Sequence, residues 1–405
     1  LRREWQDRLE TMLGEVNANR VLAEAIGRFN QYRFTYVING WVPSDKADSF
    51  SQRIKLKAPE ILLEAYPTQR GAHDQNVPVE LRNPWVIRAF QSFVMNYARP
   101  LYEEIDPTWL IGLTFPILFG AMFGDVGQGV ILVIAGLLLT SRRVKFLRGL
   151  GGLGGVITAC GVSAIIFGFL YGSVFGFEQF VPALLFRPIS SVTTVMIFAI
   201  SIGVILLSIG FIISILNSLT TRNWGKMLFD QHGLSGLLLY WSLIGLALEG
   251  ITGSHPIPII VIVLIALVSA VATIFSEALS HLVNHHQPLF EGGAGVYTVQ
   301  SIFELFEFLI SLLSNSVSFV RVGAFAVAHG GLTVVFFILA RLVGPDGGIG
   351  YWLVLVVGNV FIIGFEGLIV GIQSMRLEYY EFFSKFFSGG GIRYEPLTLS
   401  AKLEK

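Results

Sequence analysis

The feature that most constrains this chain is a succession of long apolar segments that begins at Pro107. A helix needs about 20 apolar residues to cross a bilayer, and eight segments reach or approach that length. Their bounds are 107–123, 126–141, 156–177, 191–217, 233–251, 256–283, 297–343 and 350–387. The expected fold class is therefore an all-α polytopic membrane domain with about eight transmembrane helices. The last two segments exceed the bilayer thickness, so we expect two long, tilted C-terminal helices. The first two are short, which leaves open that they form one broken helix.

Composition separates a polar first quarter from this apolar remainder. Of the 405 residues, 53% are hydrophobic and 14% are charged, against about 25% charged residues in soluble domains. Residues 1–106 hold half of the 28 acidic and 28 basic residues. We therefore divide the chain into the C-terminal portion of a cytoplasmic α+β domain (1–106), a transmembrane domain (107–388) and a cytoplasmic tail (389–405). The sequence begins without Met or a signal-like apolar region, so we expect the chain to be part of a longer protein.

Short elements are predicted in the polar quarter. Apolar residues recur at helical spacing in residues 1–30. This stripe belongs either to a core or to a coiled coil with a segment outside the chain. FTYVINGWVP is typical of a strand that ends at a glycine turn. Ser44 is expected to cap a short helix, residues 58–85 to form a loop, and PWVIRAFQSFVMNYARP to lead into the membrane as a helix.

The distribution of basic residues in the loops indicates the orientation. If the polar quarter is cytoplasmic, the outer loops carry only Arg187 and Arg341. The inner loops carry Arg142, Arg143, Lys145, Arg148, Arg222, Lys226, Lys385 and Arg393. This bias places both termini in the cytoplasm and favours an even number of spans.

Ionisable side chains inside the predicted spans are functional candidates, because they are costly at membrane depth. They are Glu249, Glu277, Glu304, Glu307, Arg321, His329, Glu366 and Arg376. For Glu249, near the outer end of a span, an interfacial role is the preferred interpretation. Arg321 stays ionised at any physiological pH and lies near the middle of segment 297–343, which we predict as one unbroken helix.

Polar residues of segment 297–343 gather on the side of Arg321. At 100° per residue, Ser314 lies about 20° and Glu307 about 40° from the direction of Arg321. Ser318 and His329 lie within about 80°. A rise of about 1.5 Å per residue places Glu307 about 21 Å from Arg321 along the axis and His329 about 12 Å away in the opposite direction. The segment therefore has a polar stripe that crosses the membrane.

Segment 350–387 has a matching stripe. Glu366, Gln373 and Arg376 follow one another at spacings of 7 and 3 and share a face. Because this segment returns to the inside, we expect Glu366 in the outer half with His329, and Arg376 further in. Two polar stripes on antiparallel neighbours would line a water path, since lipid does not tolerate them. The alternatives are structural ion pairs that hold the helices together and a neutral His329 bonded to backbone.

Other motifs give weaker signals. Glu277, His281 and His285 recur at spacings of four with His286 beside them, a pattern able to hold zinc, but a polar helix end is the preferred interpretation. FGDVGQG is glycine-rich, but it follows an apolar span rather than a strand, so no nucleotide site is expected. We expect no cofactor, no metal, no nucleic acid partner and no catalytic site in this chain.

The apolar segments and their polar residues resemble the membrane subunit called a, or I, of V-type and archaeal A-type rotary ATPases. The resemblance is carried by DPTWLIGLTFPILFGAMFGDVGQG, FGFLYGSVFGF, NSVSFVRVGAFAVAHGGL and FEGLIVGIQSMRLEYYEFFSKFF. It implies an essential arginine at Arg321, a histidine at His329 and a glutamate at Glu307. In the last segment it implies a role for Glu366 and a second arginine at Arg376.

The chain departs from this family in length and in detail. The family has several hundred cytoplasmic residues before its membrane part, whereas only 106 residues precede Pro107 here. Gln128 stands where eukaryotic relatives often have histidine, and GGL follows His329. Both features are prokaryotic in style, so a prokaryotic plasma membrane is the expected location.

The resemblance implies the stator half of a rotary proton translocator, non-catalytic by itself. A proteolipid ring with one buried carboxylate per subunit would turn against it, and stalk subunits and a central ring adaptor would join it. Arg321 would favour the ionised form of each passing carboxylate and block a direct leak between two half-channels. Glu307 and Ser314 would line the inner half-channel.

His329 and Glu366 would line the outer half-channel, with Gln373 on the stripe of Glu366. Arg376 would either tune Glu366 or line the inner path, and the sequence leaves both open. The coupling ion, H⁺ or Na⁺, also stays open.

Two other classes compete with this interpretation. One is a secondary transporter that binds an anionic substrate at Arg321, which favours inverted repeats and helices broken near midspan. The other is a membrane scaffold with structural ion pairs only. Copurification of a proteolipid ring would distinguish the stator subunit from both.

Overall fold

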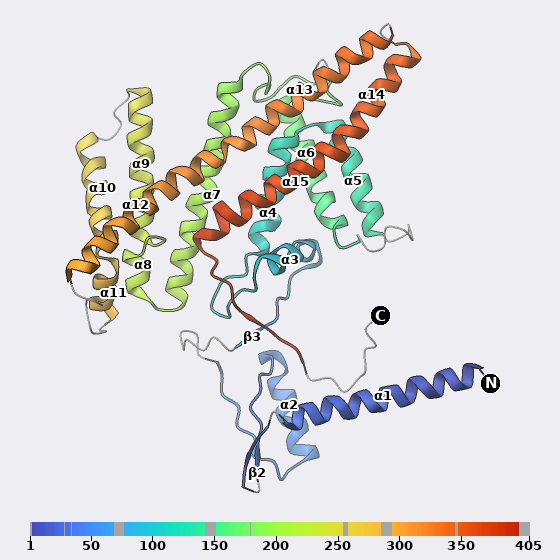
Figure 1. Ribbon diagram of the computed structural model, residues 1–405, viewed down its shortest axis with the longest axis vertical. Helices are drawn as coiled ribbons and strands as arrows, with labels where there is room; N and C mark the ends of the chain where they lie inside the picture. The colour runs from blue at the N-terminus through green and yellow to red at the C-terminus, as the bar shows by residue number, and fades with distance from the viewer. Residues whose placement is uncertain are drawn as a thin grey trace. The chain divides into compact units, whose positions relative to one another are not determined.

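The computed structural model describes residues 2–27, 29–33, 35–68, 77–141, 151–178, 180–253, 258–284, 294–344 and 347–396. By its internal contacts the chain divides into two compact units. The smaller comprises Leu1–Glu80 with Gly391–Lys405, and the larger Leu81–Gly390. Figure 1 labels the elements of both.

The smaller unit combines helices with short strands. Its elements are α1 (Arg2–Gly27), β1 (Asn30–Tyr32), β2 (Thr35–Val37), α2 (Ser44–Lys57), β3 (Pro78–Val79) and β4 (Ile392–Arg393). β1 and β2 pair antiparallel, while β3 and β4 pair parallel. The predicted tail thus contributes a strand. Pro43 occupies the N-cap position of α2, and no side chain caps this helix. The predicted cap at Ser44 is therefore wrong, because Ser44 is the first helical residue.

The apolar stripe of α1 is uncovered. Leu9, Met12, Leu13 and Val16 are 49–64% exposed. Side chains of a core would be buried, so this exposure favours the coiled-coil interpretation, in which a partner segment covers the stripe.

The larger unit is helical. Its elements are α3 (Trp85–Tyr97), α4 (Thr108–Phe123), α5 (Val126–Thr140), α6 (Gly154–Tyr171), α7 (Val192–Thr220), α8 (Trp224–Phe229), α9 (Leu234–Thr252), α10 (Ile259–Ile274), α11 (Ser276–Asn284), α12 (Ala294–Ser318), α13 (Val320–Val343), α14 (Ile349–Phe361), η2 (Ile362–Glu366), α15 (Gly367–Arg376), η3 (Leu377–Phe382) and η4 (Phe383–Lys385).

The helices of this unit include several candidate membrane spans. Among the described residues, five helical stretches are long and apolar enough to cross a bilayer. The pair Ile259–Ile274 and Ser276–Val283, bent by 73°, would make a sixth. α4 and α5 are apolar but shorter. A mostly helical membrane protein is therefore confirmed, and the count of eight spans stays a prediction.

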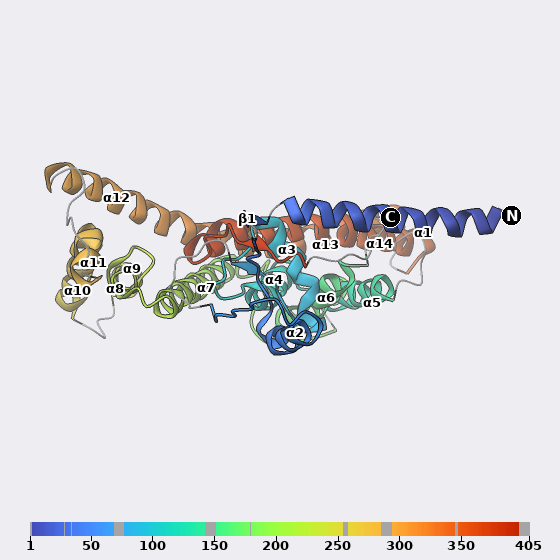
Figure 2. The same cartoon turned by 90° about the horizontal axis from the view of Figure 1, so that it is seen from below.

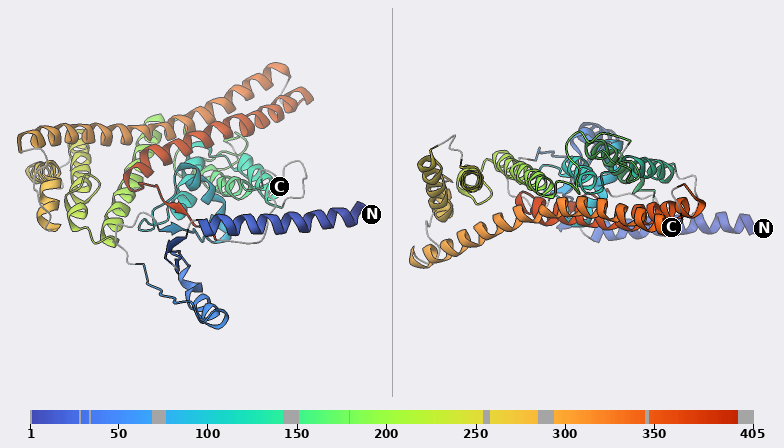
Figure 3. Two further views of the ribbon diagram at one scale, coloured as in Figure 1. Left: turned by 60° about the horizontal axis from the view of Figure 1, so that its bottom comes forward. Right: turned by 90° about the horizontal axis from the view of Figure 1, so that it is seen from above.

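The helices lie in two layers (Figures 2 and 3). The long segment α12–α13 and the returning segment α14–α15 form one layer, and α4–α7 with α9 and α10 form the other. The core between them is largely aromatic and includes the fully buried rings of Phe211, Phe319, Phe382 and Phe383. The two long segments are neighbours, as predicted.

Helices α4 and α5 are two separate helices that run in opposite directions along α6. Close contacts at glycines show these directions. Along α4 the contacts advance in the same direction as α6, from Gly120 with Ser163 to Gly124 with Tyr171. Along α5 they run in the opposite direction, from Val126 with Gly168 to Gly136 with Thr158. Any Cβ at these glycines would lie within 2.7 Å of its neighbour. Small residues therefore let the backbones approach, and the alternative of one broken helix is excluded.

The predicted segment 297–343 is one 47-residue helical span, and a turn at Phe319 separates α12 from α13 within it. The Val322 N–H donates to the Phe319 carbonyl at 2.9 Å, the three-residue spacing of a 3₁₀ turn. Phe319 packs against Gly203 of α7, where a Cβ would lie 2.4 Å from its ring. This contact fixes the break two residues before Arg321.

The eighth segment also departs from a regular α-helix. Ile362–Glu366 and Leu377–Phe382 are π-helical and flank α15. Such wide turns are frequent at functional sites. Glu366 ends the first wide turn and Arg376 directly precedes the second, so both candidate charges lie where the helical register changes.

The FGDVGQG motif has a structural role. The Asp125 carboxylate is fully buried. It accepts the N–H groups of Gln128, Phe175 and Gly176 at 2.9 Å each and the Ser173 hydroxyl at 2.6 Å. One carboxylate thereby joins the α4–α5 turn to the loop after α6.

Replacing Asp125 by Ala should destabilise the folded protein by about 3–5 kcal/mol, because each buried donor left unpaired costs about 1–3 kcal/mol. Thermal unfolding of the purified protein in detergent measures this effect. The matched control is Asp48→Ala, which removes an exposed aspartate of α2. An unchanged melting temperature for the Asp125 variant would contradict the structural role.

Candidate functional site

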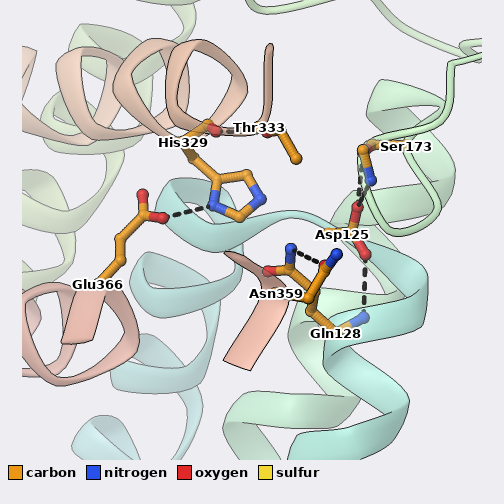
Figure 4. A network of polar contacts seen from close by, with 8 residues as sticks. Asp125, Gln128, Ser173, His329, Thr333, Asn359 and Glu366 are labelled. Atoms are coloured by element: carbon orange, nitrogen blue, oxygen red, sulfur yellow. Dashed lines mark hydrogen bonds and ion pairs between the residues drawn. The ribbon is translucent and has the colours of Figure 1, made fainter. Parts of the chain in front are cut away.

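His329 of α13 and Glu366 of η2 form a buried hydrogen-bonded pair. Nδ1 of His329 lies 3.0 Å from Oε2 of Glu366, and the two residues are only 5% and 4% exposed. The predicted proximity of these residues is confirmed. An ionised carboxylate only accepts hydrogen bonds, so with Glu366 in that form Nδ1 of His329 is the donor, and Nε2 is the ring nitrogen that faces away from the pair. Figure 4 shows the pair beside the carbonyl of His329, which accepts the Thr333 hydroxyl at 2.6 Å.

A small cavity opens beside His329. The volume open to the centres of water molecules is about 30 Å³. One water molecule needs about 10–15 Å³ of such volume. The lining residues include His329, Thr333, Ser173 and Glu178. Nε2 of His329 is buried and has no partner within the described ranges. This acceptor is therefore available to water in the cavity.

Arg321 lies half-buried near the start of α13. Its Nη1 atom is buried and lacks a hydrogen-bond partner among the residues described. Its charged neighbours are Arg376 and Glu381, and Glu381 also faces Ser318. Two guanidinium groups beside one carboxylate leave a net positive charge. Since an unpaired buried donor is costly, this cluster is suited to receive a further anionic group.

A second, larger cavity of about 300 Å³ lies at the α12 end of the long segment. Its lining residues are Gln231, His232, Glu304, Glu307, Phe308, Ser311 and Lys385. Glu307 therefore lines a polar space, as a half-channel residue would. Lys385, which the charge pattern assigns to the inner side, is buried at the end of the eighth segment and only 4% exposed.

The other predicted site residues lie on more open faces. Ser314 on α12 and Arg376 are exposed, and Gln373 is partly exposed. Glu366 is buried against His329, whereas Arg376 neighbours Arg321. The stripe predicted for the eighth segment is thus divided between two surroundings.

Sequence reasoning missed several buried polar groups. Glu378 is 0% exposed, and its two carboxylate oxygens have no hydrogen bond to any described group, although Thr114 lies beside them. Gln128 donates to Asn359 at 2.9 Å and links α5 to α14. The spacing of Glu378, Glu381 and Lys385, by three and four residues within an aromatic run, was the available signal.

The zinc pattern falls partly outside the described residues. Glu277 and His281 lie on α11, whereas His285 and His286 are not described. Within the described ranges, no group of three His, Cys, Asp or Glu residues is placed to hold a metal ion.

Several curated relatives, all named A-type ATP synthase subunit I, match most of the chain. A-type ATP synthase subunit I of Methanocaldococcus jannaschii is 27% identical over 98% of this chain and 60% of its own length. The subunits of the same name from Pyrococcus horikoshii and Methanothermobacter thermautotrophicus are each 25% identical, over 92% and 99% of this chain. The chain spans 55–60% of the length of these three relatives.

The family match includes the residues that form the candidate site. The family of the V-type ATPase 116 kDa subunit matches residues 3–179 and 279–399. These ranges contain Arg321, His329 and Glu366, as well as the Asp125 turn. Since the match covers well over half of the sequence, the chain belongs to the V-type ATPase 116 kDa subunit family.

Proposed function

We propose that this chain is the membrane stator subunit of a rotary V/A-type ATPase or ATP synthase, and that it forms two offset half-channels for protons. The observation that supports this most is the position of Arg321 between two cavities. On the long segment, Ala326 to Val334 border one cavity, and Glu304 to Ser311 border the other. Arg321 lies between these stretches in the chain and has a buried N–H group without a hydrogen-bond partner among the described residues.

The outer half-channel would consist of the small cavity and the His329–Glu366 pair. Water in the cavity can donate a proton to Nε2 of His329, while Glu366 holds the ring through Nδ1. A cation formed on the imidazole is stabilised by the carboxylate 3.0 Å away. The pair can therefore accept a proton and release it again.

Arg321 would act on a carboxylate supplied by a proteolipid ring. A fixed guanidinium favours the ionised form of a nearby acid, so an arriving protonated acid loses its proton. The ionised form is costly against lipid, so each carboxylate must be protonated again before it leaves. Arg376 belongs with Arg321 in this scheme and strengthens the positive field, while Glu381 offsets part of it.

The remaining parts of the proposal concern the complex. The relatives are named as subunits of an ATP synthase, so we assign ATP chemistry to partner chains and no catalytic site to this one. Its partners would be the proteolipid ring, peripheral stalk subunits, a central ring adaptor and the bilayer. We place it in a prokaryotic plasma membrane with both termini in the cytoplasm. The basic loop at 142–150, which carries much of the orientation signal, lies outside the described residues.

The transporter and scaffold alternatives receive less support. The break at Phe319 is a single residue within a 47-residue segment that still qualifies as one span, unlike the discontinuous helices that bind transporter substrates. A scaffold with structural ion pairs does not require the unpaired Nη1 atom of Arg321.

Arg321→Gln should abolish ATP-driven proton uptake by vesicles that hold the assembled complex, because Arg376 and Glu381 alone would leave no net positive charge at that point of the path. The matched control is Arg341→Gln, which removes a cation from the last turn of the same helix and should leave uptake intact. Normal uptake with the Arg321 variant in an assembled complex would overturn the proposed function.

Glu366→Gln should slow proton uptake by about tenfold or more, since the protonated ring of His329 loses its counter-charge and positioned proton carriers contribute about 10²–10⁴-fold. Assembly should persist, because Gln can still accept the Nδ1–H bond. Proton flux at fixed ATP concentration is the measurement. Glu277→Gln, at an exposed position of α11, serves as the control. Equal flux in both variants would remove Glu366 from the path.

A further inference from the structure

Lys385 occupies an unusual position for a lysine. It lies in η4 at the end of the eighth segment and is only 4% exposed. Its Cβ lies 3.3 Å from the place that a Cβ on Gly210 would occupy, so it packs closely on α7. Asn217 of α7 donates to the carbonyl of Phe386 at 3.3 Å and holds the adjacent backbone. Lysine is almost never this buried unless its charge is compensated.

Lys385 lines the larger cavity together with Glu304 and Glu307 of α12. In the part of the chain that is described, Lys385 makes no direct ion pair with either glutamate. A cavity of about 300 Å³ holds many waters, at about 10–15 Å³ for each. The charges therefore face one another across water.

Two further titratable groups belong to this site. His232 lines the same cavity and lies within the electrostatic reach of Lys385, and Asp230 acts on His232 in turn. The titratable groups that share the cavity with Lys385 are thus His232, Glu304 and Glu307, and Asp230 is a further charged neighbour of His232. Acids outnumber permanent cations here, so Lys385 is the main source of positive charge.

We infer that Lys385 is a positioning residue of the inner half-channel, whose ammonium group supplies the positive charge in the cavity that Glu304 and Glu307 also line. This inference rests on the proposed function and adds a residue to it. A nearby cation favours the charged form of a carboxylate. Two glutamates one helical turn apart oppose each other's ionisation unless a cation offsets their repulsion. The ammonium group itself does not need to exchange a proton with the path.

The main test compares substitutions of Lys385 in the whole complex. Lys385→Met should lower ATP-driven proton uptake by roughly tenfold or more, because the cavity loses the cation that it holds beside Glu304 and Glu307. Lys385→Arg keeps the charge and should retain most of the uptake. Lys226→Met, at an exposed basic residue of α8, should have no effect. Loss of uptake in both the Met and Arg variants of Lys385 would indicate a packing role and overturn the inference.

A double substitution tests the link to Glu307. If Lys385 acts through this acid, then Lys385→Met with Glu307→Gln should be no worse than Glu307→Gln alone. Multiplied losses would mean that the residues act independently, against the inference. Arg321→Gln is measured alongside. Normal uptake with Lys385→Met but none with Arg321→Gln would reject the role of Lys385 alone, whereas normal uptake with Arg321→Gln would reject the proposed function.

A labelling experiment measures the potential in the cavity without transport. Ser311 lines the cavity, and Cys160, the single cysteine of this sequence, is buried and gives little background. In a Ser311→Cys complex, the rates of modification by an anionic and a cationic methanethiosulfonate are compared. Adding Lys385→Gln, a substitution that shortens the side chain by one carbon and keeps a hydrogen-bond donor, should lower the anionic-to-cationic ratio by roughly fivefold. An unchanged ratio would overturn the inference.

Discussion

The larger unit depends on one constraint: a charge that leaves water must be met by opposite charge, by hydrogen-bond donors or by water brought in with it. Asp125 is met by four donors, all from the turns around it. Glu366 is met by His329. Lys385 is met by a hydrated cavity with two glutamates. Arg321 and Glu378 differ, because one N–H group of Arg321 and both carboxylate oxygens of Glu378 have no hydrogen bond within the described chain. For Arg321, we propose that a carboxylate of a partner chain supplies the missing bond.

Much of the fold was predictable because the apolar segments are long and their ends are marked. The breaks inside them were not predictable from the same pattern. Phe319 interrupts α12–α13 because Gly203, more than a hundred residues earlier, leaves room for its ring. That cause lies in a contact between distant segments, whereas periodicity reports only neighbours within one helix. The π-turns around α15 likewise have no local signature in the sequence.

The candidate site was predictable for those residues whose ionisable side chains have a high free-energy cost inside a membrane. Arg321, His329 and Glu366 lie deep within predicted spans. The free-energy cost of ionisable side chains at that depth identified them as candidates. Lys385 lies near a span end, where a basic residue normally marks the inner loop, so the charge pattern gave no sign that its side chain is buried. Asp125 was missed for a different reason, since three of its four donors belong to residues 173–176, on the far side of α6.

The wide turn at Ile362–Glu366 also affects how this family should be aligned. A π-turn accommodates one residue more than an α-turn without interrupting the helix. Loss of that residue would rotate everything beyond it by about 100° and would turn Glu366 and Arg376 to new faces relative to α14. In a relative that lacks one residue here, the helix beyond the turn is therefore rotated about its axis, and a one-residue gap in the alignment does not describe that difference. Equivalent positions after the turn must be matched by the contacts they make, because counting residues from α14 would pair side chains that face different neighbours.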